Sequence, residues 1–253
     1  MVLSVTTRKN ISGSKPLDKE KSNIAQMFDK IAWRYDFLNH FFSLNIDKIW
    51  RRKAVNELRR RTLSHVLDVA TGTADLALLL HKRLRPGLIT GVDISEGMLA
   101  IGREKVEKKG LAQTISLQYG DSEDLPFDDH TFDAVTVAFG VRNFENLDKG
   151  LAEMFRVLKN DGKVIILEFS IPRNCIIRGI YYFYFSRILP FVGRLVSKDA
   201  YAYNYLPDSV QSFPYGDGFR EKMENCGFIE VAVRPLTFGI ACLYTGRKSI
   251  NDF

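Results

Sequence analysis

The sequence predicts an α/β fold built on a seven-stranded, mostly parallel sheet with helices on both faces. Between residues 65 and 170, apolar β-rich runs alternate with helical segments, which favours parallel strands whose connecting helices cover both faces. Near the C-terminus two more strand-like runs are joined by "PLTFG", which is too short for a crossover helix, so we expect an antiparallel hairpin. Ligands of such sheets bind at the carboxyl ends of the strands.

The elements follow one another in a regular order. Residues 23–60 alternate aromatic and charged side chains at helical spacing and are expected to form a helical lead-in. The strands that follow are expected at "HVLDVA", "LITGVDI", "ISLQYGD", "FDAVTVAF" and "KVIILEFS". The helices between them are expected at "ADLALLLHKRL", "EGMLAIGREKVEKK" and "LDKGLAEMFRVLK".

Length and composition indicate one domain. The chain has 253 residues, 45% of them hydrophobic, which is enough for one full-sized core and marginal for two. We expect residues 1–22 to be a flexible polar arm and residues 23–253 to form a single domain, in which residues 171–214 are an insertion or cap. The net charge of +6 is compatible with an anionic membrane surface or nucleic acid as partner, but many other proteins share it.

The cysteines and the N-terminus bear on the cellular setting. Cys175, Cys226 and Cys242 are too few and too scattered for a disulfide framework or a zinc site, which favours a reducing compartment. The N-terminal arm lacks the apolar core of a signal peptide. No apolar run approaches the roughly 20 residues needed to cross a bilayer. We therefore expect a cytoplasmic protein without a metal site.

The stretch "VLDVATGTADLA" has the outline of a nucleotide-binding loop but contains one glycine, Gly72. Dinucleotide sites generally have the pattern G-x-G-x-x-G, which lets the backbone close on a pyrophosphate. Here methyl groups stand where the other glycines would be, so a pyrophosphate would be crowded. A ligand without phosphate, such as S-adenosylmethionine, needs one close backbone approach and donors for its carboxylate, which Gly72 and Thr73 can supply. Asp68 at the strand end can meet the amino group of that ligand.

Two more acidic strand ends extend this site. The second strand ends in Asp93, about twenty residues past Gly72, where a carboxylate can accept hydrogen bonds from both ribose hydroxyls. The third strand leads into Asp121 and Ser122, which can bind the edge of an adenine. Any single aspartate at a strand end can be a helix cap. Three in register predict a nucleoside site, although Asp93 alone does not distinguish NAD from S-adenosylmethionine.

On these motifs the chain resembles the class I S-adenosylmethionine-dependent methyltransferases, which have a Rossmann-like fold, and among them the C-methyltransferases of menaquinone and ubiquinone biosynthesis. The resemblance runs from about Met27 to the end, and "YDFLN" and "FGVRN" are its most diagnostic motifs. The other matching segments include "DSEDLPFDDHTFDAV", "VIILEFSIP" and "YLPDSVQSFP". The chain departs from the family pattern at four places: Asp47, Ala74, Ala138 and the "NDG" of residues 160–162.

The resemblance implies S-adenosylmethionine as the cofactor. The implied contacts fall on Thr73, Asp93, Asp121, Ser122 and Ala138, and at Ala138 a contact is limited to backbone or packing. With the residues of the loop and the following helix, the expected cofactor site comprises Asp68, Gly72, Thr73, Asp93, Met98, Asp121, Ser122 and Ala138.

The reaction implied by the resemblance is methylation of a ring carbon of a reduced, prenylated quinone, namely demethylmenaquinol or the benzoquinol precursor of ubiquinone. A hydroquinone hydroxyl has a pKa of about 10, like tyrosine, so a cation that stabilises the phenolate helps greatly. Arg142, just past the fourth strand, is placed for that role. Asn143 is expected to orient the quinol oxygen or a water, and Tyr35 and Asn39 to close over the ring.

Residues 171–198 carry five basic residues and no acidic one, with tyrosine and phenylalanine between them. An apolar stripe at helical spacing runs through Ile177, Ile180, Tyr181, Tyr184, Phe185, Ile188 and Leu189. Such a helix can lie on an anionic bilayer, or it can be a lid that buries the stripe against the domain. We expect a prenylated quinol as substrate, transient membrane contact on the inner face of the cytoplasmic membrane and no nucleic-acid partner. A homodimer is left open.

Two alternative functions belong to other classes. A nicotinamide-dependent oxidoreductase on a similar sheet is opposed by the one-glycine loop and the terminal hairpin. A non-catalytic, membrane-associated subunit that kept the fold is suggested by the departures at Asp47 and Ala74. It is opposed by the retention of four site residues, Asp68, Gly72, Asp93 and Arg142. The motifs do not encode the size of the quinone ring.

Overall fold

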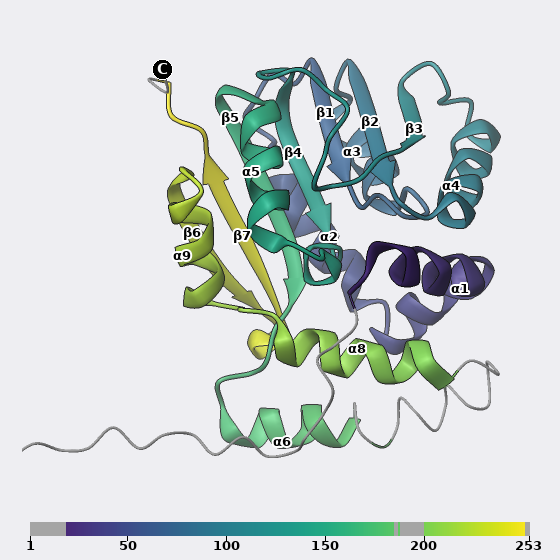
Figure 1. The fold of residues 1–253 in the computed structure, drawn as a ribbon, viewed down its shortest axis with the longest axis vertical. Helices are drawn as coiled ribbons and strands as arrows, with labels where there is room; N and C mark the ends of the chain where they lie inside the picture. The colour runs from purple at the N-terminus through teal and green to yellow at the C-terminus, as the bar shows by residue number, and fades with distance from the viewer. Residues whose placement is uncertain (1–18, 185–186, 188–199, 251–253) are drawn as a thin grey trace, which may run out of the picture.

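The computed structural model describes residues 19–184, 187 and 200–250. One sheet runs in the order β3-β2-β1-β4-β5-β7-β6 (Figure 1). Its strands are β1 (His65–Val69), β2 (Leu88–Asp93), β3 (Ile115–Tyr119), β4 (Phe132–Ala138), β5 (Leu158–Phe169), β6 (Ile229–Leu236) and β7 (Ala241–Arg247). The first five strands are parallel, and β7 lies between β5 and β6 and is antiparallel to both. The predicted fold is confirmed.

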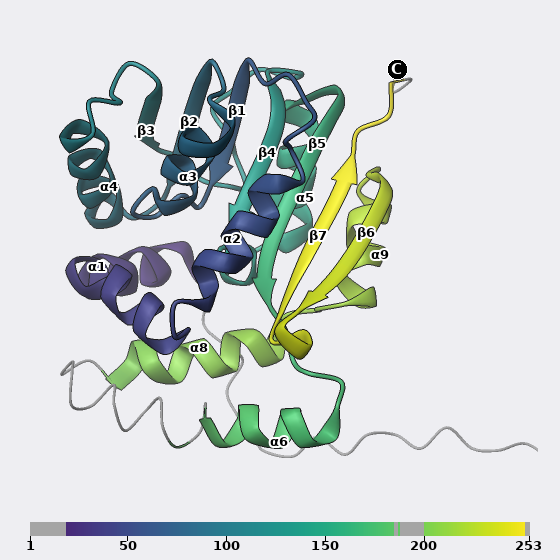
Figure 2. The same ribbon diagram turned by 180° about the vertical axis from the view of Figure 1, so that it is seen from behind.

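Helices cover both faces of the sheet, as Figures 1 and 2 show from opposite sides. One face carries α2 (Ile46–Asn56), α3 (Asp75–Leu84) and α4 (Glu96–Lys108), and the other carries α5 (Leu147–Val157) and α9 (Asp217–Asn225). Polar caps start two of these helices, because the side chains of Ser95 and Asn146 accept hydrogen bonds from backbone N–H groups of the first turn.

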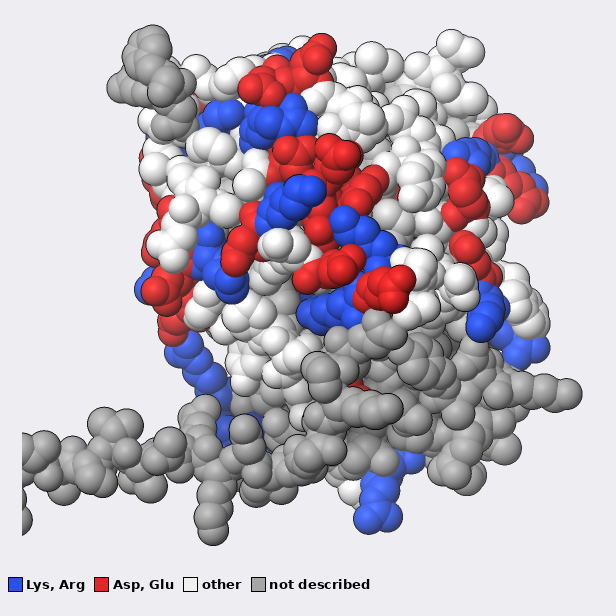
Figure 3. Space-filling view, in the orientation of Figure 1, with Lys and Arg blue, Asp and Glu red and all other residues white. Residues whose placement is uncertain are grey.

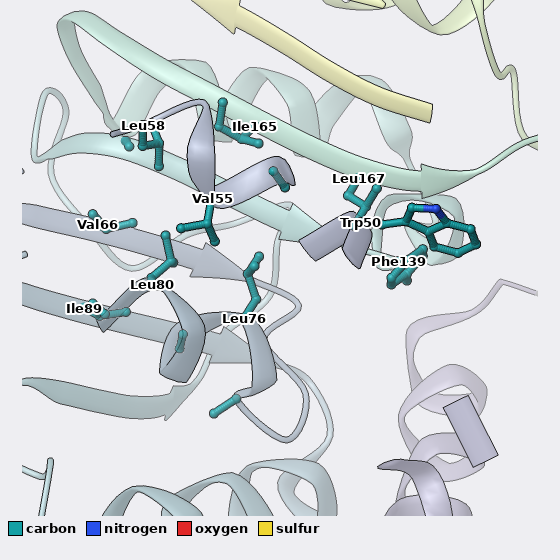
Figure 4. Close-up of a cluster of buried hydrophobic side chains, with 14 of the residues drawn as sticks. Trp50, Val55, Leu58, Val66, Leu76, Leu80, Ile89, Phe139, Ile165 and Leu167 are labelled. Carbon is teal, nitrogen blue, oxygen red and sulfur yellow. The ribbon is translucent and has the colours of Figure 1, made fainter. Parts of the chain in front are cut away.

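The core has two layers because side chains alternate along each strand. On β1, Val66 faces the α2–α3 layer and Leu67 faces the α5 layer. Figure 4 shows the first layer, in which Trp50 lies beside Leu167 of β5 and Leu80 lies beside Val66 of β1. Burying such large side chains contributes about 1.5–3 kcal/mol each. The rigid sheet therefore fixes where its strand ends lie.

The "NDG" of residues 160–162 is one of the departures from the family pattern. The structure places it inside β5 as a bulge, since the pairing with β4 jumps from Leu158 opposite Phe132 to Lys163 opposite Ala134. Asp161 has φ +62°, the left-handed conformation that aspartate tolerates better than most residues. The local conformation is thus turn-like although the strand continues through it.

A third group of helices lies beyond the carboxyl ends of the parallel strands (Figure 1). It consists of α1 (Lys21–Phe42), α6 (Cys175–Phe183) and α8 (Ala200–Ser212). The predicted lead-in is helical, as α1 and α2, and the predicted cap contains α6 and α8. Of the predicted apolar stripe, Phe185, Ile188 and Leu189 lie outside the described residues, as do residues 1–18 of the predicted arm. Within the described part of the chain, no helix is both long and apolar enough to span a membrane.

Candidate active site

A cavity of about 640 Å³, including the space at its mouth, lies between α1 and the carboxyl ends of β1, β2 and β4. Eight of the predicted site residues line it, namely Tyr35, Gly72, Asp93, Met98, Asp121, Ser122, Ala138 and Asn143. The other three, Asp68, Thr73 and Arg142, are buried and do not line it. The fold therefore gathers residues that are up to about a hundred positions apart in the sequence.

Asp93 at the end of β2 holds the loop after β1. Its Oδ2 accepts a hydrogen bond from the backbone N–H of Gly72 at 2.8 Å, and its Oδ1 accepts one from Ser95 at 2.9 Å. Burial raises the pKa of Asp93 to about 6, although these N–H donors oppose the rise. Gly72 has φ +56°, so its role in this structure is to turn the loop and to donate to Asp93.

Asp68 and Thr73 support the same loop from behind. The two carboxylate oxygens of Asp68 accept hydrogen bonds from the hydroxyls of Thr71 and Thr136, both at 2.7 Å. Burial raises the pKa of Asp68 to about 6, although the two hydroxyl donors act to lower it. The hydroxyl of Thr73 donates to Asp36 on α1 at 2.5 Å. These side chains fix the loop and the helix above it.

Ala74, one of the departures from the family pattern, keeps a glycine-like backbone. Its φ is +65°, which an L-residue adopts at a cost of about 1–2 kcal/mol and glycine adopts freely. The methyl group of Ala74 is fully buried. An alanine at this position therefore holds the loop in a conformation that a glycine would adopt at lower cost.

Asp47, the departure from the family pattern that falls in the lead-in, is buried and paired. Its carboxylate accepts a hydrogen bond from the hydroxyl of Ser43 at 2.6 Å and lies 2.9 Å from Nδ1 of His40. Arg51 lies 3.6 Å away on the same helix. The aspartate thus ties the end of α1 to α2, and it does not line the first cavity.

Helix α1 forms the roof of the cavity. Ile24, Phe28 and Tyr35 point into it from α1. Polar contacts hold the helix at three points along its length: Lys21 with Asp121 at 2.6 Å, Asp29 with the Ser95 hydroxyl at 2.6 Å, and Asp36 with Thr73. A second carboxylate, that of Glu123, lies 3.0 Å from Lys21.

Arg142 lies in the short turn η1 (Val141–Asn143) that follows β4. Its guanidinium forms a 2.9 Å ion pair with Glu168, which is fully buried at the end of β5, and donates to the carbonyl of Phe139. Burial alone would lower the pKa of Arg142, but the Glu168 carboxylate raises it above the ordinary value. Nε of Arg142 is buried and has no hydrogen-bond partner among the residues that the structure describes. One donor of this buried guanidinium therefore lacks a partner among the described residues.

A second cavity, about 980 Å³ with its mouth included, lies below the first among α1, α6 and α8. Its lining is almost entirely apolar or aromatic and includes Ile177, Ile180, Tyr181 and Tyr184 of the predicted stripe. Tyr181 is buried and Ile177 and Tyr184 are partly buried, whereas Ile180 is 65% exposed, so the described part of the stripe lies partly against the domain and partly at the surface.

The two cavities meet at an aromatic wall. Phe139 lines the first cavity and Phe169 the second, and their ring centroids are 4.6 Å apart. Tyr35 lines the first cavity, and Asn39, one helical turn further along α1, lines the second. Burial raises the pKa of Tyr35, so that its phenol stays protonated at neutral pH.

Several residues of this site were not predicted from the sequence. Glu168 had a detectable signal, because it is the one acid in the apolar run "VIILEFS" and buried acids are nearly always paired. Tyr205 of α8, whose hydroxyl donates to Asn143 at 3.1 Å, had none that a single sequence reveals. The same holds for Lys21 and Asp36, since each meets its partners only through the packing of α1.

The residues present fit S-adenosylmethionine. The acidic end of β2 and Asp121 offer acceptors for ribose hydroxyls and an adenine amino group. Among the described residues that line the first cavity, the only lysine or arginine is Lys21, which is already paired with Asp121 and Glu123. A pyrophosphate would find no available cation there. Sheet order, one-glycine loop and acidic strand ends together define a class I S-adenosylmethionine-dependent methyltransferase.

The model of the ubiE/COQ5 methyltransferase family matches residues 16–248, and the chain belongs to that family. It is 48% identical to the demethylmenaquinone methyltransferase of Bacteroides fragilis, over 91% of this chain and 94% of that protein. It is also 48% identical to the ubiquinone/menaquinone biosynthesis C-methyltransferase UbiE of Geobacter sulfurreducens, over 93% and 92% of the two chains. These matches confirm the predicted enzyme class and cofactor and support neither alternative function.

A solved structure shares the fold. A methyltransferase of Thermotoga maritima, titled S-adenosylmethionine-dependent and possibly a histamine N-methyltransferase, superposes with a TM-score of 0.62 at 18% identity, covering 88% of this chain and 99% of its own. At that identity the likeness concerns the fold alone.

Proposed function

We propose that this protein transfers the methyl group of S-adenosylmethionine to a ring carbon of a reduced, prenylated quinone, with demethylmenaquinol as the first candidate and the benzoquinol precursor of ubiquinone as the second. The observation that carries the proposal is the junction of a polar, nucleoside-type cavity with an apolar one at Phe139 and Phe169. A quinol ring at that wall reaches the cofactor on one side. Its prenyl tail leaves through the other.

The reaction requires a nucleophilic ring carbon. S-adenosylmethionine supplies an electrophilic methyl group when it is bound. Loss of the hydroxyl proton pushes electron density into the quinol ring, and the carbon attacks the methyl group in line while the sulfur keeps the electron pair of the broken bond. The ring then loses its own proton at that carbon and recovers its aromaticity. The protein has to stabilise the quinolate oxygen and exclude water.

Arg142 is the proposed stabiliser of the quinolate. Its unpartnered Nε provides a charged donor. The carboxylate of Glu168 balances the guanidinium charge before the substrate binds, so the buried arginine is tolerated. Asn143 lines the cofactor cavity and provides a second donor. Tyr35 remains protonated and closes the roof over the ring.

The test is single-turnover transfer of labelled methyl to reduced demethylmenaquinone. Arg142→Ala should lower the chemical rate roughly a hundredfold, because one preorganised charged donor is worth about 3 kcal/mol. Arg142→Lys should recover part of the rate, since it keeps the charge and loses the planar fork. Cofactor affinity should be nearly unchanged in both, because Arg142 does not line that cavity. An unchanged rate in Arg142→Ala would contradict the assignment.

We also infer that α6 docks reversibly on an anionic membrane, which makes the protein peripheral. Large apolar side chains are exposed around the second cavity, at Leu44, Ile176, Ile180, Phe183 and Phe238. Arg178 of α6 adds an exposed positive charge beside them. An apolar rim of this kind suits a membrane surface from which a prenylated substrate enters. Over the described residues of the face in Figure 3, acidic and basic side chains alternate, which does not favour nucleic acid.

Co-sedimentation with lipid vesicles tests the membrane contact. Binding should rise with the anionic lipid content and fall with salt. The double variant Ile176→Ser/Phe183→Ser should bind several-fold more weakly. Leu88→Ser is the matched control, because Leu88 is half exposed at the opposite end of the sheet. If binding depended neither on lipid charge nor on the α6 substitutions, the membrane role would be wrong and α6 would act only as a lid.

A further inference from the structure

The turn η1 is held from two sides. Glu168 reaches it from the sheet and pairs with Arg142. Tyr205 reaches it from the cap helix α8, and its hydroxyl donates a hydrogen bond to Oδ1 of Asn143 at 3.1 Å. Tyr205 is 4% exposed, so this bond forms away from bulk water. Asn143 itself lines the cofactor cavity.

The bond from Tyr205 decides which end of the Asn143 amide faces the cavity. An asparagine side chain has an oxygen that only accepts and a nitrogen that only donates. Because the oxygen is occupied by the phenol, the Nδ2 group is the end left for a ligand. Within the described chain, no hydrogen bond from Nδ2 of Asn143 is formed. A rotated amide would present its oxygen, which repels a negatively charged quinol oxygen.

We propose that Tyr205 is a positioning residue for methyl transfer, which fixes Asn143 so that Nδ2 donates to the quinol oxygen as its charge develops. This inference rests on the proposed function. Tyr205 does not line the cofactor cavity and acts through Asn143. A donor held in place before the reaction contributes more than one that must first rotate.

The next residue of α8 extends the proposal to the tail of the substrate. Leu206 lines the apolar cavity, and Tyr205 holds Asn143 beside the cofactor cavity. One turn of α8 thus contacts both parts of the site. A prenyl tail that packs on Leu206 holds Tyr205 against η1. Remote binding energy of this kind acts on the rate of the chemical step.

The experiment measures kcat, KM and cofactor affinity of Tyr205→Phe with a tailed and a tail-less demethylnaphthoquinol. We expect kcat to fall about tenfold with the tailed substrate, while cofactor affinity and the melting temperature stay close to wild type. The tail-less substrate should react slowly with wild type, and the ratio of the two rates should shrink in the variant. Tyr182→Phe, which removes an exposed hydroxyl of α6, is the matched control.

A double-mutant cycle separates this role from a general structural one. In an Asn143→Ala background, Tyr205→Phe should cause no further loss of single-turnover rate, because the group that it positions is gone. A full kcat in Tyr205→Phe, or an equal loss in both backgrounds, would overturn the inference. If wild type transferred no methyl group to either quinol, the proposed function itself would fail.

Discussion

Among individual residues, Asp93 combines two tasks. It holds the loop after β1 through Gly72, and it is the acceptor placed for the ribose hydroxyls of the cofactor. Its burial raises its pKa to about 6, which makes its charge sensitive to mild acid. A protonated carboxyl loses one of its acceptor positions, so only the ionised form suits the cofactor.

We predict that cofactor affinity falls as the pH drops below about 6. Binding favours the ionised form of Asp93, so the affinity is full well above this pKa and is lost as the pH falls through it. At pH 5 the affinity for S-adenosylhomocysteine should be about tenfold weaker than at pH 7.5. Calorimetry across this range measures the effect.

Asp93→Asn is the control for this prediction. It should weaken binding by about 1–3 kcal/mol at neutral pH and flatten the pH dependence. Asp68 also has a pKa raised to about 6, but its oxygens face Thr71 and Thr136 instead of the cavity. A pH dependence that persists in Asp93→Asn would point to Asp68 as its source.

Among the elements, α1 has the most direct influence on the cofactor. It covers the cavity, and it is attached by polar contacts of Lys21, Asp29 and Asp36 and by a small apolar cluster that contains Ile24 and Met27. Asp29 accepts hydrogen bonds from both the hydroxyl of Ser95 and the backbone N–H of Gly97, at the start of α4. The roof is thus tied to the N-terminus of a helix of the main domain.

We predict that Asp29→Ala loosens the roof. Amide hydrogen exchange in residues 21–42 should become several-fold faster, and S-adenosylhomocysteine should bind several-fold more weakly, because α1 loses two hydrogen bonds worth about 1 kcal/mol each. Glu96→Ala is the matched control, since Glu96 lies in the same first turn of α4 and pairs with Arg103 on the surface. Equal exchange in both variants would mean that packing alone holds α1.

The whole molecule consists of a rigid sheet with a helical layer over its strand ends. Both cavities lie between these two parts, with Asp93 and Phe139 on the sheet side and α1, α6 and α8 on the other. A ligand that contacts both parts should raise the free energy of unfolding of the whole domain, because it binds the folded protein and not the unfolded chain.

We predict that S-adenosylhomocysteine at a hundred times its Kd adds about 2.7 kcal/mol to the free energy of unfolding. For a domain of this size that corresponds to a rise in Tm of roughly 5–10 °C. NADH at the same concentration should leave Tm unchanged, because the first cavity offers a pyrophosphate no available cation. Stabilisation by NADH alone would revive the oxidoreductase alternative.

Much of the fold was predictable because its signals are local. Strands, helices and the terminal hairpin follow from the spacing of apolar residues and from the short "PLTFG" connection. Strand ends such as Asp93 were predictable as well, since parallel strands present their carboxyl ends on one edge. Tyr35 and Asn143, which the family motifs single out, line the first cavity.

Tertiary structure alone decided which groups face one another. Gly72 donates to Asp93 and Asp68 faces two threonines because the loop folds back on the neighbouring strands. Arg142 meets Glu168 only because β4 pairs with β5, and Tyr205 meets Asn143 only because α8 crosses the strand ends. Hydrogen bonds and ion pairs act over a few ångströms, and packing brings their partners together without leaving a periodic signal in the sequence.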